Sequence, residues 1–353
     1  MRPSHPPHLS GIVATIALTV IGLAGCNAPA TDAETNTQDQ RFLHALETEA
    51  KPWSHEGFDD QEEDFTFAIF SDLTGGERER IFEVAVAQLN LLRPELVMSI
   101  GDLIEGGTED RSRLEAEWGS FDQRAGGTVA PVFYVGGNHD LTNLTMREVW
   151  EARYGVRYYH FVYEDVLFLV LDTEDHEPAR MREIYEARDT FIQLQRAGRT
   201  WAELEETTYF NMPERTAGDV GAVQSEYFIT ALAEHPEVRW TFLFMHKPIW
   251  REAEDPEFAA IEAALGDRPY TLFNGHLHNY GHAVRNGRDH ITLGTTGGNQ
   301  NPDSETAFDH LTLVRMTGEG PVIAQLRMDG ILDKTGSVPL DGDTLCFQAS
   351  QCD

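Results

Sequence analysis

The sequence predicts an α/β fold whose polar functional residues gather where strands end. Short apolar runs rich in β-branched and aromatic residues, bounded by turn residues, are typical of buried strands. The first two runs, 65–70 and 96–100, begin about thirty residues apart, which is the size of a β-α-β unit. Polar residues follow each run directly, and open sheets of this class bind ligands at the carboxyl ends of their strands.

Six apolar runs are expected to form strands, and most of them lead into a polar residue. In chain order they are 65–70, 96–100, 132–135, 166–172, 241–245 and 270–273.

Helices and a hairpin complete the expected layout. Apolar residues in 78–92 recur at helical spacing, and Pro94 ends that pattern. Segment 221–235 is expected to form a second helix that packs on the sheet. Near the end of the chain, 310–316 and 322–328 are joined by "TGEG" and predict a β-hairpin. We interpret the charged, helix-prone stretch near 174–225 as a helical insertion within one domain, residues 51–353.

The N-terminus predicts export. Residues 11–25 form an apolar run that is short for a membrane span and typical of a signal peptide. The run ends in "LAGC", which resembles the lipobox of bacterial lipoproteins, with Cys26 as the lipidated first residue of the mature chain. We therefore expect a lipoprotein signal at 1–25 and a lipidated, flexible tether at 26–50. An ordinary cleaved signal or a small anchor is the alternative.

This reading places the protein in the bacterial cell envelope, attached to the membrane through the lipid on Cys26. Asn27 follows the cysteine where an Asp would favour retention in the inner membrane. The expected location is therefore the outer membrane, facing the periplasm.

Cysteine usage is consistent with an oxidising compartment. The chain has 3 Cys, and Cys346 and Cys352 flank a short tail loop, so we expect them to form a disulfide. Closing so small a loop would contribute about 2 kcal/mol and would pin the tail rather than hold the fold. A zinc site is the alternative.

The charge of the chain argues against a general nucleic-acid binder. Lys and Arg total 27 against 59 Asp and Glu, which gives a formal net charge of -32. Such a chain repels phosphate backbones at long range, and no basic stripe offsets that repulsion.

Residues able to bind metal follow five separate predicted strands. One Asp after a strand is commonly a helix cap, and one His is commonly a structural residue. The joint pattern is harder to explain in this way, because every strand end would have to carry such a residue by chance. The set comprises Asp72, Asp102, Asn138, His139, Asp140, His246, His276 and His278.

Two-metal phosphoryl chemistry gives this pattern a purpose. Two divalent ions about 3.5–4 Å apart can clamp a phosphoryl group and generate a hydroxide nucleophile. A carboxylate is needed to bridge the ions, while mixed nitrogen and oxygen ligands suit Mn, Fe or Zn. A histidine outside the ligand set can protonate the leaving oxygen.

The ordered motifs "SDLT", "GDLIE", "GNHD", "MHKP" and "GHLH" resemble those of calcineurin-like metallophosphoesterases. The resemblance covers roughly 65–293. It implies a two-sheet α/β/β/α sandwich with helices outside and a site for two divalent metal ions (Mn, Fe or Zn) at the strand ends.

The resemblance also implies a role for each residue of the set. Asp72 and His278 would bind the first metal, and Asp102 would bridge both metals. The ligands of the second metal would be Asn138, His246 and His276. His139 would stabilise the phosphoryl group or protonate the leaving group, with Asp140 as its partner, while a metal-bridging hydroxide attacks phosphorus.

Thr74 departs from the family's first motif, Asp-x-His, where histidine is a metal ligand. Three outcomes are open. Glu105, three residues after Asp102, substitutes as a ligand; water completes a weakened site; or the site holds one metal or none and binds without turnover. The adjacent Gly75 and Gly76, together with the Thr74 hydroxyl, are candidates for contacting substrate phosphate, although the two glycines are equally consistent with a plain turn.

Together these observations predict a lipid-anchored enzyme that hydrolyses a phosphomonoester or phosphodiester. Its expected substrate is a phosphorylated small molecule or a component of the cell envelope. Two alternatives remain open, a degenerate lipoprotein that binds a phosphorylated ligand and an envelope nuclease. The net charge argues against the second.

Overall fold

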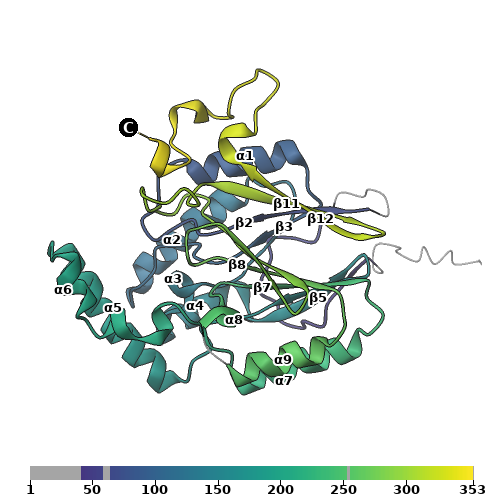
Figure 1. Ribbon diagram of the computed structural model, residues 1–353, viewed down its shortest axis with the longest axis horizontal. Coiled ribbons are helices and arrows are strands. Elements are labelled where there is room, and N and C mark those ends of the chain that lie inside the picture. Colours follow the sequence, from purple (N-terminus) through teal and green to yellow (C-terminus); the bar gives the residue numbers. More distant parts are fainter. Residues whose placement is uncertain (1–40, 59–63, 253–254, 353) are drawn as a thin grey trace, which may run out of the picture. The chain divides into compact units, whose positions relative to one another are not determined.

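Two mixed β-sheets pack face to face, and helices cover the outer face of each (Figure 1). The computed structural model describes residues 41–58, 64–252 and 255–352, all of which belong to one compact unit, Gln38–Asp353. The two-sheet sandwich expected from the sequence is confirmed. The expected signal segment, Cys26 and the tether up to residue 40 lie outside the described residues.

The larger sheet has seven strands, and its centre is parallel. β6, β7, β8 and β10 run parallel to one another, while β1, β5 and β9 pair antiparallel at the edges. In spatial order the strands are β1 (Phe42–Leu43), β5 (Tyr159–Tyr163), β6 (Val166–Val170), β7 (Trp240–Met245), β8 (Tyr270–Asn274), β10 (Arg288–Thr292) and β9 (Gly281–Arg285).

The smaller sheet has five strands and carries the expected hairpin. β11 and β12 pair antiparallel along their whole length, whereas β2, β3 and β4 are parallel. The spatial order is β12 (Gly320–Arg327), β11 (His310–Thr317), β2 (Thr66–Phe70), β3 (Leu96–Ser99) and β4 (Val132–Phe133).

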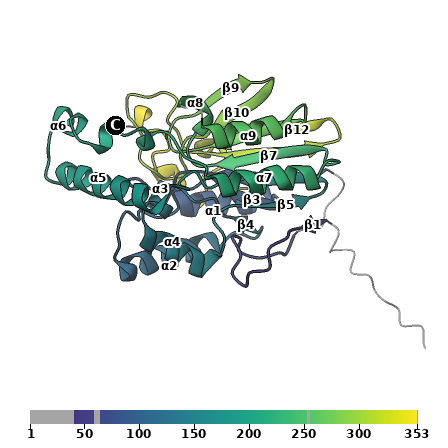
Figure 2. The ribbon, with the colours of Figure 1, turned by 90° about the horizontal axis from the view of Figure 1, so that it is seen from below.

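The helices divide between the two outer faces (Figure 2). Apolar residues of α1, α2 and α4 pack on the five-stranded sheet, and those of α7 and α9 pack on the seven-stranded sheet. The α-helices are α1 (Ile81–Leu92), α2 (Arg111–Ala125), α3 (Asn138–Leu141), α4 (Leu144–Tyr154), α5 (Pro178–Arg196), α6 (Trp201–Glu205), α7 (Ala222–Glu234), α8 (Ile249–Glu252) and α9 (Pro256–Leu265). Short 3-10 turns lie at Tyr209–Asn211, Pro213–Arg215, Met328–Gly330, Gly342–Thr344 and Ala349–Gln351.

The segment expected to be a helical insertion contains α5, α6 and two of the 3-10 turns, between β6 and β7. Both views show α5 beside α3 and α4 (Figures 1 and 2). In the part of the chain that the structure describes, no helix has both the length and the apolar character needed to span a membrane.

Phenylalanines fill the space between the sheets. In β2, Phe67 and Ile69 face the opposite sheet, while Ala68 and Phe70 face the helices. This two-residue period, with both faces buried, explains why the strand reads as a continuous apolar run. Phe168 lies at the centre of the layer and stacks on Phe161, with ring centroids 4.5 Å apart.

Two elements end earlier or start later than their sequence pattern predicts. The helix expected from residue 78 begins at Ile81, because Arg80 takes a left-handed conformation with φ 70° and the Arg78 side chain reaches away to buried Asp309 at 2.6 Å. The strand expected at 132–135 pairs only over β4, because the Tyr134 backbone N–H instead donates to the carbonyl of Pro52.

The C-terminal tail is pinned beside this ion pair. Cys346 and Cys352 are joined by a disulfide, so neither thiol is available to a metal. Arg78 donates to the carbonyl of Cys346 at 2.8 Å, and the Asp309 backbone N–H donates to the carbonyl of Phe347 at 2.8 Å. The disulfide loop therefore packs on the segment that precedes α1.

Phe168→Ala should lower the free energy of unfolding by about 3–5 kcal/mol, because it removes a fully buried ring and leaves a cavity between the sheets. The measurement is equilibrium urea denaturation. Val284→Ala is the control, since that side chain is 66% exposed, and it should change stability by less than about 0.5 kcal/mol. A loss below about 1 kcal/mol for Phe168→Ala would contradict the packing described here.

Candidate metal centre

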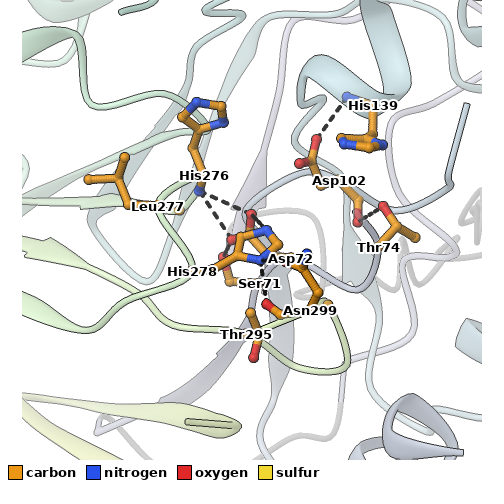
Figure 3. Close-up of polar contacts among 12 residues, drawn as sticks. Ser71, Asp72, Thr74, Asp102, His139, His276, Leu277, His278, Thr295 and Asn299 are labelled. Carbon is orange, nitrogen blue, oxygen red and sulfur yellow. Dashed lines mark hydrogen bonds and ion pairs between the residues drawn. The ribbon is translucent and has the colours of Figure 1, made fainter. Parts of the chain in front are cut away.

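The ends of four strands bring the sequence-predicted ligands together at one edge of the sandwich. Asp72 and Asp102 follow β2 and β3, and His246 follows β7 directly. His276 and His278 come from the loop after β8, and Asn138 is the first residue of α3. Figure 3 shows the backbone N–H of His276 bonded to the Asp72 carboxylate, with His278 beside Asp72.

The side chains form two groups that share one carboxylate. Ligand atoms of Asp102, His246 and His276 all lie within 4.8 Å of one another, and the same is true of Asp72, Asp102 and His278. The side-chain amide oxygen Oδ1 of Asn138 lies 3.2 Å from His246 Nε2 and therefore joins the first group. Asp102 thus belongs to both groups.

Four of the candidate ligand residues have a strained backbone conformation. Asp72, Asp102, His276 and His278 have φ values of 49°, 56°, 72° and 52°, in the left-handed region that non-glycine residues rarely adopt. Each such residue costs on the order of 1–3 kcal/mol, and strain of this kind clusters at functional sites. The strained loops turn these four side chains into two adjoining ligand groups that share Asp102.

Each of the three histidines presents one ring nitrogen to the site and ties the other to the backbone. His246 Nδ1 lies 2.8 Å from the carbonyl oxygen of Ile100, and His278 Nδ1 lies 2.6 Å from that of Asn299. His276 Nε2 lies 2.8 Å from the carbonyl oxygen of Arg215. Because a carbonyl oxygen can only accept, these outer nitrogens carry the proton, and the inner ones are available as ligand atoms.

The buried acidic groups attract positive charge to the inner nitrogens. Burial opposes protonation of His246, but Asp102, whose Oδ2 lies 3.3 Å from His246 Nε2, raises the pKa of its imidazole to about 9. Burial acts in the same way on His278, where Asp72 raises the pKa to about 9. Burial and the neighbouring His246 hold the pKa of His276 well below its usual value.

The neighbouring histidines and burial also shift the pKa values of the carboxyl groups. Burial favours a raised pKa for Asp102, yet His246 and His139 hold that pKa well below its usual value. Burial and the charge of Asp102 raise the pKa of nearby Asp140 to about 8. A site with these nitrogen and oxygen ligands and this excess of buried carboxylate fits divalent cations.

His139 lies beside the ligand groups without belonging to them. Its backbone N–H donates to Asp102 Oδ1 at 2.9 Å, and its Nδ1 lies 2.8 Å from the carbonyl oxygen of Glu105. Nε2 faces the guanidinium of Arg188 at 3.2 Å. Burial lowers the pKa of His139, and the charge of Asp102 partly opposes that shift.

Asp140 does not contact the His139 ring, contrary to expectation. Its carboxylate accepts backbone N–H groups from Leu103 at 2.9 Å, Ile104 at 3.2 Å and Gly137 at 2.8 Å. The bond to Gly137 caps the start of α3, and the other two hold the loop that carries Asp102. Asp140 therefore fixes two loops and acts on the site only through them.

The structure does not place Glu105 among the ligands. One carboxylate oxygen accepts the backbone N–H groups of Gly76 at 2.9 Å and Glu77 at 2.8 Å. The other lies 4.0 Å from His139 Nδ1. Glu105 thus ties the loop after β3 to the loop after β2, which places it outside both ligand groups.

Thr74 is buried and joins the same two loops by hydrogen bonds. Its hydroxyl donates to the backbone carbonyls of Ile104 at 2.7 Å and Asp102 at 3.1 Å (Figure 3). The expected contact of Thr74 with substrate phosphate therefore does not fit this geometry, and the Gly76 N–H is already bonded to Glu105. Gly75 remains at the site, because a Cβ there would lie 3.2 Å from the His278 ring.

A cavity of about 870 Å³ opens over the ligand groups. Its far wall comes from α5, α6 and the following turns, including Arg188, Phe191 and Trp201. The sequence analysis did not identify Arg188. Nothing in the spacing of a charged helical segment indicates which side chain it will present to a site built elsewhere in the chain.

Comparisons with known proteins agree with this arrangement. Residues 65–280 match the family model of the calcineurin-like phosphoesterases. A search of the curated proteins gives no significant match.

Solved structures with a similar fold have low sequence identity to this chain. A dimetal phosphatase from Danio rerio is 16% identical with a TM-score of 0.53, covering 74% of this chain and 96% of that one. GAP50, described as the anchor in the inner membrane complex of Plasmodium, is 14% identical with a TM-score of 0.48 and coverages of 78% and 87%. A purple acid phosphatase from yellow lupin seeds is 13% identical with a TM-score of 0.48 and coverages of 76% and 52%.

The family match spans more than half of the sequence and contains all six ligand candidates, from Asp72 to His278, which the structure gathers around Asp102. The chain belongs to the calcineurin-like phosphoesterase family.

Proposed function

We propose that the protein is a phosphoester hydrolase that uses two divalent ions held on either side of Asp102. The observation that carries this proposal is the sharing of the Asp102 carboxylate by two ligand groups. The three histidines whose outer nitrogens are tied to the backbone provide the remaining support, because such outer partners orient metal ligands.

When bound, the ions would lower the pKa of a water molecule and withdraw charge from the phosphoryl oxygens. The residues of the chain have separate tasks. Asp72 and His278 would hold one ion, while Asn138, His246 and His276 would hold the other. His139 lines the cavity and would stabilise the phosphoryl group there. To protonate the leaving alcohol, its Nε2, which faces Arg188 Nη2, would first have to take up a proton.

The site would work in the bacterial cell envelope, with the protein attached to the outer membrane through a lipid on Cys26. This part of the proposal rests on the "LAGC" sequence and the apolar run before it. The substrate would be a phosphorylated small molecule or a component of the envelope.

A binding protein without turnover is the second candidate. It is favoured by the Asp72 group, where Thr74 replaces the family's histidine and Glu105 does not take its place. That group relies on two carboxylates and one imidazole from the chain, with water left to complete the coordination.

Asp102→Asn and Asp72→Asn should separate the two ion positions. Asp102→Asn should empty both positions and lower the hydrolysis of p-nitrophenyl phosphate by at least ~100-fold, equivalent to ~2.7 kcal/mol. Asp72→Asn should remove ion from one position only. Metals per chain are measured by elemental analysis after loading with Mn or Zn, with Asp303→Asn, an exposed position, as control.

Equal metal content in the two variants would contradict a bridging role for Asp102. A wild-type protein that retains its ions but hydrolyses neither phosphomonoesters nor phosphodiesters would favour the binding protein.

Asp140→Asn should act on stability through the loops. The amide that replaces one carboxylate oxygen cannot accept a backbone N–H, so a buried donor loses its partner, at a cost of about 1–3 kcal/mol. The free energy of unfolding is measured by urea denaturation, alongside kcat for p-nitrophenyl phosphate. Unchanged stability with a large loss of kcat would instead identify Asp140 as the direct partner of His139.

A further inference from the structure

Arg188 extends from α5 to the edge of the candidate metal centre, from a segment outside the five sequence motifs. The residue is only 5% exposed, and its Nη2 lies 3.2 Å from His139 Nε2. Its side chain also lines the cavity above the ligand groups. The guanidinium is therefore both buried and in contact with the space where substrate would bind.

The loop after Asp102 is shaped to admit this guanidinium. Gly107 has a φ of 59°, and a Cβ at that position would lie 2.4 Å from Arg188 Nη1. Any larger residue would push the guanidinium away from His139. Gly106 is packed in the same way, because a Cβ there would lie 1.8 Å from the carbonyl oxygen of His139. Gly107 therefore makes room for the Arg188 guanidinium, and Gly106 makes room for the backbone of His139.

Among the described residues, Arg188 makes no ion pair, although the chain carries a large excess of carboxylates. The contrast within the same cavity is clear, since Arg113 pairs with Glu117 at 2.6 Å. His139 offers Arg188 a neutral nitrogen acceptor, which does not balance the charge. Burying an uncompensated cation is costly, so a guanidinium in this position is best satisfied by an anion that enters the cavity.

The cavity is positively charged relative to the rest of the molecule. Its lining contains Arg113, Arg188, Arg196 and Arg215 but only two acidic residues, Asp102 and Glu105. The whole chain has a formal charge of -32. A positively charged cavity attracts small anions and raises their local concentration, even when the protein as a whole is acidic.

We propose that Arg188 binds a non-bridging oxygen of the substrate's phosphoryl group and makes the enzyme selective for dianionic phosphomonoesters over monoanionic phosphodiesters. This inference rests on the proposed function, which it deepens. A monoester carries one more negative charge than a diester and leaves one more terminal oxygen free for a guanidinium. Arg188 is thereby a specificity-determining residue.

Arg188 is neither protonated nor deprotonated during the hydrolysis. The oxygen of a water molecule forms a bond to phosphorus and releases a proton. The ester P–O bond breaks, its electron pair stays with the alcohol oxygen, and that oxygen takes up a proton, so the products are orthophosphate and the alcohol. Arg188 contacts the phosphoryl oxygens throughout and neutralises part of their charge.

A binding measurement tests the charge selectivity without relying on turnover. Phenylphosphonate and its monomethyl ester have the same ring and differ by one negative charge at about pH 8, above the second pKa of such groups. Their dissociation constants are measured by calorimetry on the full chain loaded with Mn. Wild type should prefer phenylphosphonate. Arg188→Met should reduce that preference by about 10- to 100-fold, as for the loss of a charged hydrogen bond.

Two variants provide the controls. Arg182→Met removes the same charge from an exposed position on the same helix and should leave the preference unchanged. Arg188→Lys keeps the charge without the planar fork and should fall between wild type and Arg188→Met. Metals per chain are measured in each variant, and if Arg188→Met loses its ions, Arg188→Lys carries the comparison.

The kinetic counterpart compares phenyl phosphate with diphenyl phosphate. Arg188→Met should lower kcat/KM for the monoester at least ~10-fold more than for the diester. An equal loss for both esters would overturn the proposal and make Arg188 a residue that only positions His139. An unchanged preference for phenylphosphonate would also overturn it. If the wild type hydrolyses neither ester, the proposed function fails, while the binding comparison still decides the role of Arg188.

Discussion

The position of the Asp102 carboxylate is the constraint on which the rest of the site depends. The carboxylate accepts the backbone N–H of His139, lies against His246 and belongs to both ligand groups. Two glycines make this possible, because a Cβ on Gly137 would lie 2.4 Å from Asp102 Oδ1 and one on Gly101 would lie 2.8 Å from His246 Nδ1. The close approach of these loops explains the glycines in "GDLIE" and "GNHD" by packing as well as by turn geometry.

Hydrogen bonds between loops hold this arrangement where the sheets themselves end. Asp140 binds the loop after β3 to the start of α3, and Glu105 and Thr74 bind it to the loop after β2. All three are polar residues close to the ligands in sequence, yet each is engaged with the backbone. Hydrogen bonds from these three side chains to the backbone thus hold the strained ligand residues in place.

Apolar strands followed by polar residues were sufficient to predict an α/β fold with candidate ligands at the strand ends, and the two-sheet sandwich was implied by the resemblance of the motifs to those of calcineurin-like metallophosphoesterases. Thr74, Glu105 and Asp140 could not be assigned in the same way. Their roles depend on which backbone N–H or carbonyl group lies nearby, and sequence spacing carries no such information. Arg188 was missed for a related reason. It belongs to α5, which lies between β6 and β7 in the chain and outside every ligand motif.

Anomalous diffraction from crystals of the protein loaded with Mn tests the central claim most directly, because it locates the ions as well as counting them. The account predicts two anomalous peaks on either side of the Asp102 carboxylate. One peak should lie beside His246 and His276, and the other beside Asp72 and His278. A peak on Glu105, or a single peak that does not touch Asp102, would contradict the account.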